Sequence, residues 1–227
     1  LLQDVLSDAG RSVVIEGFQG ALSSRATMER ITISDDEGVW LTVEGIVLDW
    51  NRSALLRGRL EVDEFSAERI VLPRGPITED TPTPEATPFS IPDLPVSVDI
   101  ARLAIDRAEI GAALLGQDAV MQLGGEAHLA GGGADIDIAL SRIDDKTGEI
   151  SLDASYDPAS EEAAIDLTMQ EGEGGIAAGM LSIPGTPPVE LSLQGAGPIA
   201  DLTTTLTVAS DGEERLGGTI SLAASED

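Results

Sequence analysis

Apolar and polar residues alternate with a period of two over most of this chain. The clearest run covers residues 134–140, where isoleucine and leucine occupy every second position between aspartates. Similar runs cover residues 150–156, 163–169 and 202–208, and short segments rich in Asp and Gly separate them. This pattern is typical of antiparallel strands that are joined by short turns and share one apolar face.

The alternation changes phase at Gly45. Residues 39–43 carry their apolar side chains at odd positions, whereas residues 46–50 carry them at even positions. A glycine at a change of phase is typical of a β-bulge or a bend, because it adopts backbone angles that other residues disfavour. We therefore expect a β-bulge or a bend at Gly45.

Three segments depart from the pattern. The apolar spacing of residues 1–6 predicts a short helix that Gly10 ends. Residues 73–95 contain most of the 12 prolines and predict an exposed linker or long loop. Residues 174–183 are small and apolar, which favours a short helix or a capping turn on the sheet. The expected organisation is an N-terminal helix with the first hairpins (1–72), the linker (73–95) and a continuing sheet (96–227).

Hairpins of about 20 residues that stack along one axis build a long sheet. We predict an all-β fold, an elongated, curled antiparallel sheet in the form of a U-shaped trough, with the short N-terminal helix at its start. Leu1 is not a methionine, and residues 225–227 follow directly on a strand-like run. Both ends are therefore expected to be cuts in a longer protein.

Composition narrows the range of partners. Asp and Glu number 41 against 13 Lys and Arg, for a formal charge of −28. Nucleic acid is disfavoured, because phosphate binding needs a basic surface, and so is broad docking on anionic headgroups. Aromatic residues make up 3% of the chain, so an interior must be built from Leu, Ile, Val and Ala. No cysteine is present, which excludes disulfides, and no apolar run reaches the roughly 20 residues of a membrane span.

No catalytic set is evident, and we predict that the chain is not an enzyme and uses no cofactor or metal. His128 is the only histidine and alternates with apolar neighbours as an exposed strand residue would. A serine triad would depend on it, and no nucleophile motif is present. The acidic segments 35–38, 144–145 and 211–214 are typical of turns and lack the ligand spacing of a calcium loop. The sequence does not exclude a pair of carboxylates for glycoside hydrolysis, because any two strands can bring acidic side chains to the required separation.

The apolar stripe has two interpretations. It is either the ordinary core of a β-sandwich or closed barrel, or an exposed lining that holds an apolar ligand. The residues that we predict to line it are Ile31, Ile33, Val39, Leu41, Val43, Ile46, Leu48, Leu60, Val62, Ile70, Leu72, Val98, Ile100, Leu103, Ile105, Ile136, Ile138, Leu140, Ile150, Leu152, Ile165, Leu167, Leu191, Leu193, Leu202, Leu206, Ile220 and Leu222.

Residues 38–73 carry a family resemblance, from Gly38-Val39-Trp40 through Trp50-Asn51-Arg52 to Arg69-Ile70-Val71-Leu72-Pro73. This stretch resembles the N-terminal part of the TamB family in its alphaproteobacterial form. Residues 91–107 and 201–218 are similar to the same family, although their hairpin pattern is shared by other long β proteins.

The resemblance implies a periplasmic protein of a Gram-negative bacterium, anchored in the inner membrane by a segment upstream of Leu1. It also implies an apolar trough of the AsmA-like kind that carries phospholipid between the inner and outer membranes. Outer-membrane protein assembly with TamA is implied as well, through a C-terminal region that is absent from this chain. Two alternatives are a scaffold that templates client β-strands without carrying lipid, and a carbohydrate-active or adhesive β-solenoid.

Overall fold

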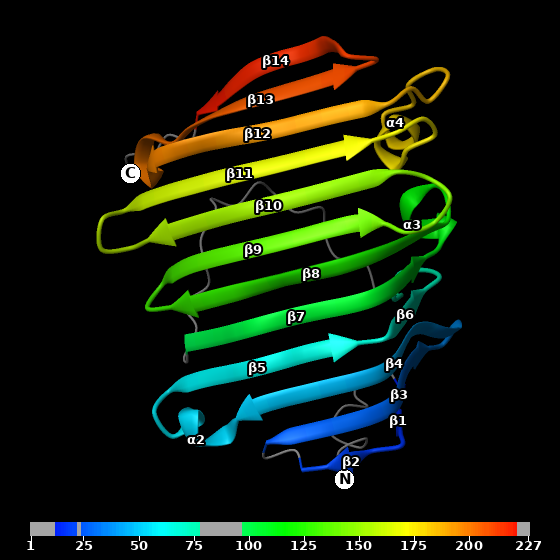
Figure 1. Cartoon of the computed structure of the whole chain (residues 1–227), viewed down its shortest axis with the longest axis vertical. Coiled ribbons are helices and arrows are strands. Elements are labelled where there is room, and N and C mark those ends of the chain that lie inside the picture. Colours follow the sequence, from blue (N-terminus) through cyan, green and yellow to red (C-terminus); the bar gives the residue numbers. More distant parts are fainter. Residues whose placement is uncertain (1–11, 22–23, 78–96, 222–227) are drawn as a thin grey trace.

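The computed structural model describes residues 12–21, 24–77 and 97–221, and most of them belong to one sheet of 14 strands (Figure 1). The prediction of an all-β fold is confirmed. The strands run across the long axis of the molecule, so that the sheet grows along that axis from β1 at one edge to β14 at the other. These two edges do not pair with each other, and the described residues contain no second sheet.

The bounds of the elements follow the polar turns. The strands are β1 (Ser12–Glu16), β2 (Gln19–Gly20), β3 (Arg25–Asp35), β4 (Gly38–Asn51), β5 (Arg59–Ala67), β6 (Arg69–Leu72), β7 (Ser97–Ile110), β8 (Ala119–Ala130), β9 (Gly133–Arg142), β10 (Gly148–Asp157), β11 (Glu162–Glu171), β12 (Val189–Pro198), β13 (Thr203–Ser210) and β14 (Glu213–Ser221). The helices are α2 (Arg52–Leu55), α3 (Ala112–Leu115), α4 (Ile176–Met180) and the 3₁₀ turn η1 (Ile199–Asp201).

The sheet is not antiparallel throughout, and this part of the prediction is wrong. Strand β7 pairs in parallel with β5 and β6, whereas every other pair of neighbouring strands in the described sheet is antiparallel. Parallel neighbours need a connection of a dozen or more residues. The long stretch between Leu72 and Ser97 meets that requirement, so the segment predicted as a linker joins two parallel strands of the same sheet.

A row of residues that runs across four adjacent strands bends one side of the sheet. The register, continued by one residue, aligns Gly17 after β1, Glu29 of β3, Gly45 of β4 and Glu68 between β5 and β6. Gly17 and Gly45 have φ values of 63° and 62°, and the side chains of Glu29 and Glu68 lie where their Cβ atoms would be. The sequence predicts a β-bulge or a bend at Gly45, and the structure has a bend there, since the β3–β4 register is not shifted at this residue. We call these four residues the kink row.

The kink row keeps apolar side chains on a single face. On its two sides the apolar residues are separated by three positions instead of two, as in Ile46 and Val43 of β4. Such pairs pack in one core cluster, which contains Met28, Ile46, Ala67 and Ile105 together with Ile31, Val43, Ile70 and Ala108. A strand without the bend would send half of these side chains to the opposite face, because alternation has a period of exactly two residues only in a regular strand.

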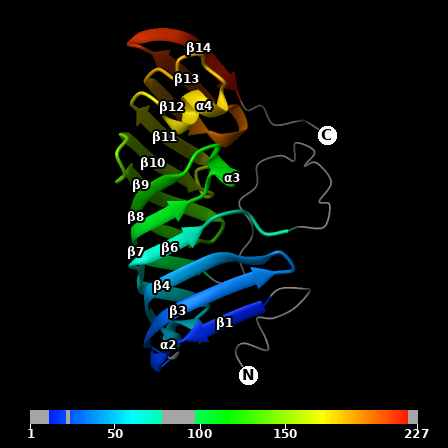
Figure 2. The same ribbon diagram turned by 90° about the vertical axis from the view of Figure 1, so that its right-hand side faces the viewer.

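Helices α3 and α4 cover the apolar face at one end of the strands. A second cluster places Leu115 of α3 and Ile176 of α4 against Met121 and Leu140 of the sheet. Figure 2 shows both helices on the side toward which the ends of β3 and β4 bend, so the apolar face is the concave one. The short helix predicted within residues 174–183 is confirmed as α4.

A partly buried ion pair between Arg74 and Asp35 holds the chain after β6 to the β3–β4 turn. The Asp35 carboxylate accepts hydrogen bonds from Arg74 Nη1 at 2.8 Å and from the amides of Glu37 and Ile77. The Arg74 hydrogen bonds are the main reason that the pKa of Asp35 lies far below its usual range. This contact fixes where the described part of the proline-rich segment leaves the sheet.

Some predicted features lie outside the described residues, namely the helix of residues 1–6, the linker from residue 78 onward and Leu222. None of the helices in the described ranges is long and apolar enough to cross a bilayer.

Candidate functional site: the apolar concave face

Two rows of apolar side chains run side by side over the concave face. Residues directly opposite in neighbouring strands point to the same side of a sheet. The first row is Ile138, Leu152, Leu167, Leu193 and Leu206 of β9 to β13. The second row is Ile105, Leu123, Leu140, Ile150, Met169, Leu191 and Val208 of β7 to β13. We call the two rows the apolar strip. Its longer row crosses six strand spacings, or roughly 29 Å.

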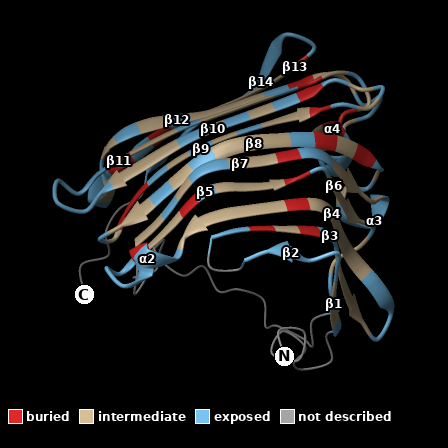
Figure 3. Cartoon of the chain, turned by 60° about the horizontal axis from the view of Figure 1, so that its bottom comes forward, coloured by how far each residue is buried: buried red, intermediate tan, exposed pale blue. Residues whose placement is uncertain are grey.

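The apolar strip is only partly covered. All of its residues have intermediate exposure except Ile105, which is buried (Figure 3). Among large side chains of the described residues, only Ile46 and Val189 are almost completely buried. Facing side chains of two packed layers fill the space between them and leave few residues half exposed. The concave face therefore differs from a sandwich core, because no second layer of described residues packs on it.

The predicted lining residues mostly lie on this face. Four of them are buried, namely Ile46, Val62, Ile105 and Leu202. Val39 and Ile220 are exposed. The remaining described ones have intermediate exposure: Ile31, Ile33, Leu41, Val43, Leu48, Leu60, Ile70, Leu72, Val98, Ile100, Leu103, Ile136, Ile138, Leu140, Ile150, Leu152, Ile165, Leu167, Leu191, Leu193 and Leu206.

Val39 and Leu202 differ from the regular pattern. Leu41 pairs with Ile33 but Val39 pairs with Ser34, so Trp40 is an extra residue and a β-bulge interrupts the alternation. Leu202 precedes β13 and is buried beside η1 instead of lying in a strand. The predicted lining omitted Leu123, Met169 and Val208 of the strip, although Met169 and Val208 belong to the alternating runs 163–169 and 202–208. The alternation of apolar and polar residues, by which the neighbouring lining residues were predicted, also identifies these three residues.

A polar cluster borders the strip beneath α4. The Arg142 side chain is only 2% exposed and donates to Asp144 Oδ2 at 2.6 Å. Burial acts to raise the pKa of Asp144, but hydrogen bonds from Arg142 and from the amides of Val120 and Lys146 outweigh it and lower the pKa. Glu171 is buried nearby and accepts from the Ala177 amide at 2.6 Å, at the start of α4. The apolar strip therefore ends at this polar cluster beneath α4.

Charged residues cover the convex face near the first strands. Glu16, Arg30, Glu44, Arg69 and Glu109 form a ladder across β1, β3, β4, β6 and β7, with successive N to O distances of 3.5, 2.7, 3.1 and 2.8 Å. Hydrogen bonds from Arg69 and then Arg107 lower the pKa of Glu109 to about 2. Opposite charges on neighbouring strands stabilise their pairing, so the ladder supports the bent part of the sheet from outside.

Replacing Glu109 by glutamine is expected to remove a pH-dependent contribution to stability. The folded pKa of about 2 is below the reference value of 4.5, so Glu109 stabilises the fold above pH 4.5 and loses this effect as the pH falls toward 2. Because the pair is partly exposed and screened, we expect Glu109→Gln to lower the free energy of unfolding by about 1 kcal/mol at neutral pH. Urea unfolding at several pH values measures the difference, which should vanish near pH 2.

Glu126→Gln is the matched control. Glu126 stands directly opposite Asp137 on the same face and makes no ion pair with a described residue. Removing its charge relieves a like-charge contact and should not destabilise the sheet. Equal pH profiles for the two variants would show that the ladder adds nothing.

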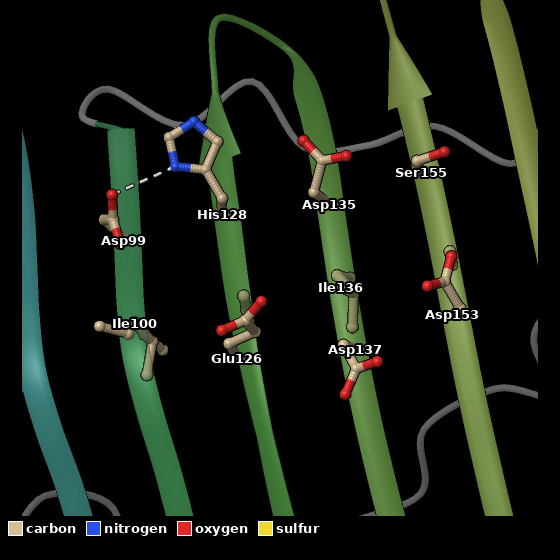
Figure 4. A pocket seen from close by; sticks show the side chains of 12 residues that line it. Asp99, Ile100, Glu126, His128, Asp135, Ile136, Asp137, Asp153 and Ser155 are labelled. Carbon is tan, nitrogen blue, oxygen red and sulfur yellow. Dashed lines mark hydrogen bonds and ion pairs between the residues drawn. The ribbon is translucent and has the colours of Figure 1, made fainter.

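A hollow of about 350 Å³ on the convex face gathers carboxylates (Figure 4). Glu126, Asp137, Asp153 and Asp166 stand in one row across β8 to β11. His128 is exposed in β8, as predicted, and its Nδ1 lies 3.3 Å from Asp99 Oδ2. No group of three or more potential ligands in the described residues is arranged to hold a metal ion. The hollow is a polar, acidic part of the convex face.

Comparison of the chain with protein-family models, with curated proteins and with solved structures finds no match.

Proposed function

We propose that the concave face holds the acyl chains of phospholipids, and that the chain is a section of a TamB-like conduit that moves lipid between two membranes. The observation that carries this proposal is the continuity of the apolar strip. From β9 to β13, neither of its rows contains a polar side chain. A mobile acyl chain needs such continuity, because each interruption would expose methylenes to polar groups.

The energetics support an apolar occupant. Removing a methylene from water contributes about 0.8 kcal/mol, so even partial contact along the strip adds up over one acyl chain. The headgroup stays in water at the open side of the concave face. The convex face is acidic, which keeps a long single-layer sheet soluble without blocking the strip. In this proposal the protein works in the periplasm and transfers lipid without chemical change.

Lipid extraction tests the proposal. The intact chain is purified without detergent from a Gram-negative host, extracted with organic solvent, and analysed by mass spectrometry against a purified soluble β protein as control. We expect at least about one molecule of diacyl phospholipid per chain, because the strip, at roughly 29 Å, is long enough to contact a whole acyl chain. A chain that is folded and monodisperse but free of lipid, even after incubation with phospholipid, would contradict the proposal.

A second candidate function is the templating of client β-strands. It is favoured by β14, a strand at the edge of the sheet whose nine residues are all exposed. An unpaired edge offers backbone hydrogen bonds to an incoming strand. Photo-crosslinkers along β14 would then capture polypeptide, whereas positions in the apolar strip would capture nothing.

A further inference from the structure

The loop between β4 and β5 is the most exposed apolar feature of the structure's N-terminal half. Leu56 is 91% exposed and Leu55 is 40% exposed. They line a hollow of about 580 Å³ together with Ser24, Trp50 and residues 51–53. Large apolar side chains that gather at one place on a surface mark an interaction site more often than scattered ones do.

The local structure holds these leucines outward. Asn51 Oδ1 accepts from the Ser53 amide at 3.1 Å and from Ser53 Oγ at 2.7 Å, which caps α2. Ala54 is fully buried and anchors the helix on the sheet. Gly58, with a φ of 71°, ends the loop and accepts a hydrogen bond from the Ser97 amide. The leucines are thus presented by a fixed loop.

The same loop is basic within a strongly acidic chain. Between Trp50 and Leu60 the only charged residues are Arg52, Arg57 and Arg59, whereas the whole chain has a net charge of −28. Arg59 pairs with Glu61 at 2.7 Å. Arg52 and Arg57 are exposed and make no ion pair with a described residue. Positive charge beside exposed leucines matches the boundary of an anionic bilayer, where headgroup phosphates lie above apolar chains.

The loop also borders the concave face. Trp50 stands directly opposite Val62 in β5, and Val62 stands opposite Ile100 in β7. Trp50 therefore belongs to the apolar side of the sheet and to the hollow of the loop at once. Figure 1 places α2 toward the N-terminal end of the sheet, across the strands from α3 and α4. A bilayer held at this loop would lie at an entrance to the apolar face.

We propose that the α2 loop (residues 50–59) docks on the surface of a bilayer that contains anionic phospholipid, and that lipid enters the concave face there. The docking step follows from the exposed leucines and from two arginines that form no ion pair with a described residue. The entry step rests on the proposed lipid-carrying function. A protein partner would need a surface that is complementary in shape to the loop and carries acidic residues. An anionic bilayer needs only exposed apolar side chains and positive charge, which the loop has.

Vesicle flotation tests the docking step. The full chain is mixed with vesicles of equimolar phosphatidylglycerol and phosphatidylcholine, or of phosphatidylcholine alone, at about 0.05 M and about 0.5 M salt. We expect binding to the anionic vesicles at low salt, weaker binding at high salt, and little binding to phosphatidylcholine. Leu55→Ser with Leu56→Ser should lower the bound fraction about fivefold or more, and Arg52→Glu with Arg57→Glu should abolish the preference for anionic lipid.

The matched control changes two other exposed apolar residues. Met180, the last residue of α4, and Leu181 directly after it are 67% and 62% exposed but have no arginine near them in sequence. Met180→Ser with Leu181→Ser should leave vesicle binding unchanged. All of the substituted residues are exposed, so circular dichroism and melting temperature should stay at the wild-type values. If the double leucine variant unfolds, the single change Leu56→Ser replaces it.

The outcomes separate this inference from the lipid-carrying proposal. Absence of wild-type binding at low salt, or binding that survives both loop variants, overturns the docking step. Self-association that is lost in Leu56→Ser would instead assign the loop to a second copy of the chain, and also overturns it. Lipid extracted from the same preparations reports on the strip independently. If the purified chain contains lipid but does not bind vesicles, the docking step is refuted and the lipid-carrying proposal stands. If the chain binds vesicles but contains no lipid, the lipid-carrying proposal is refuted.

Discussion

Replacing Leu152 and Leu167 together by glutamate is expected to lower the lipid retained by the purified chain about tenfold or more. The two residues stand directly opposite each other in β10 and β11, at the centre of the first row of the apolar strip. Acyl chains that cross this point would have to desolvate two carboxylates, which costs more than the lost methylene contacts. Both side chains are only partly covered, so glutamate can reach water in the empty chain and the sheet should still fold.

Ser151→Glu with Thr168→Glu is the matched control. Ser151 and Thr168 are also direct partners in β10 and β11, one position away on the convex face. This variant adds the same charge at the same place in the sheet but should retain wild-type lipid. The measurement is phospholipid per chain by mass spectrometry, with melting temperature recorded for each variant. Equal loss in the two variants would assign the effect to charge or stability and remove support for the strip.

The second large effect is expected at the kink row. Gly45→Val should lower the free energy of unfolding by about 3 kcal/mol, because a β-branched residue at a positive φ is strained and the new side chain meets Glu68. A Cβ atom at position 45 would lie 2.5 Å from Glu68 Cδ, at a φ of 62°. Relief of the strain by straightening β4 would turn Ile46 away from the core cluster in which it is buried. Urea unfolding measures the change.

Gly124→Ala provides the comparison for Gly45. Gly124 lies in β8 with an ordinary backbone, and an added Cβ would meet nothing closer than 3.8 Å. This change should cost less than about 0.5 kcal/mol or stabilise the strand slightly. If Gly45→Val is tolerated as well as Gly124→Ala, the bend does not depend on glycine and the kink row has no structural role.

The regular half of the molecule was predictable because its strands follow one rule. From β9 to β11 the apolar residues keep a period of two, and an Asp lies in or directly beside each turn, so that both element type and face follow from sequence. The bend at Gly45 was also visible, since a glycine and a change of phase coincide. Residues 28–31, 67–70 and 105–108 show the same spacing of three without a glycine at the centre, and for that reason their bends were missed.

Features that depend on neighbours in space could not be derived from one strand at a time. Strand β7 pairs in parallel with β5 because the long connection before it returns the chain to the same end of the sheet. The sequence of β7 itself does not show this direction. The ladder that includes Arg30 and Glu44 exists only once the register is set, because its partners are far apart in sequence. Helix α2 has four residues and depends on the Asn51 cap and on burial of Ala54. Periodicity carries no signal for so short an element.

The most direct test of the account places a photo-crosslinking amino acid at Ile138 or at Asp137 and supplies labelled phospholipid. The two residues are adjacent in β9 and point to opposite faces of the sheet, with Ile138 in the apolar strip and Asp137 in the acidic row. We predict strong lipid crosslinking at Ile138, the same result at Leu206 four strands away, and almost none at Asp137. Equal labelling at positions 137 and 138, or capture of polypeptide alone at position 138, would contradict an acyl-chain site on the concave face.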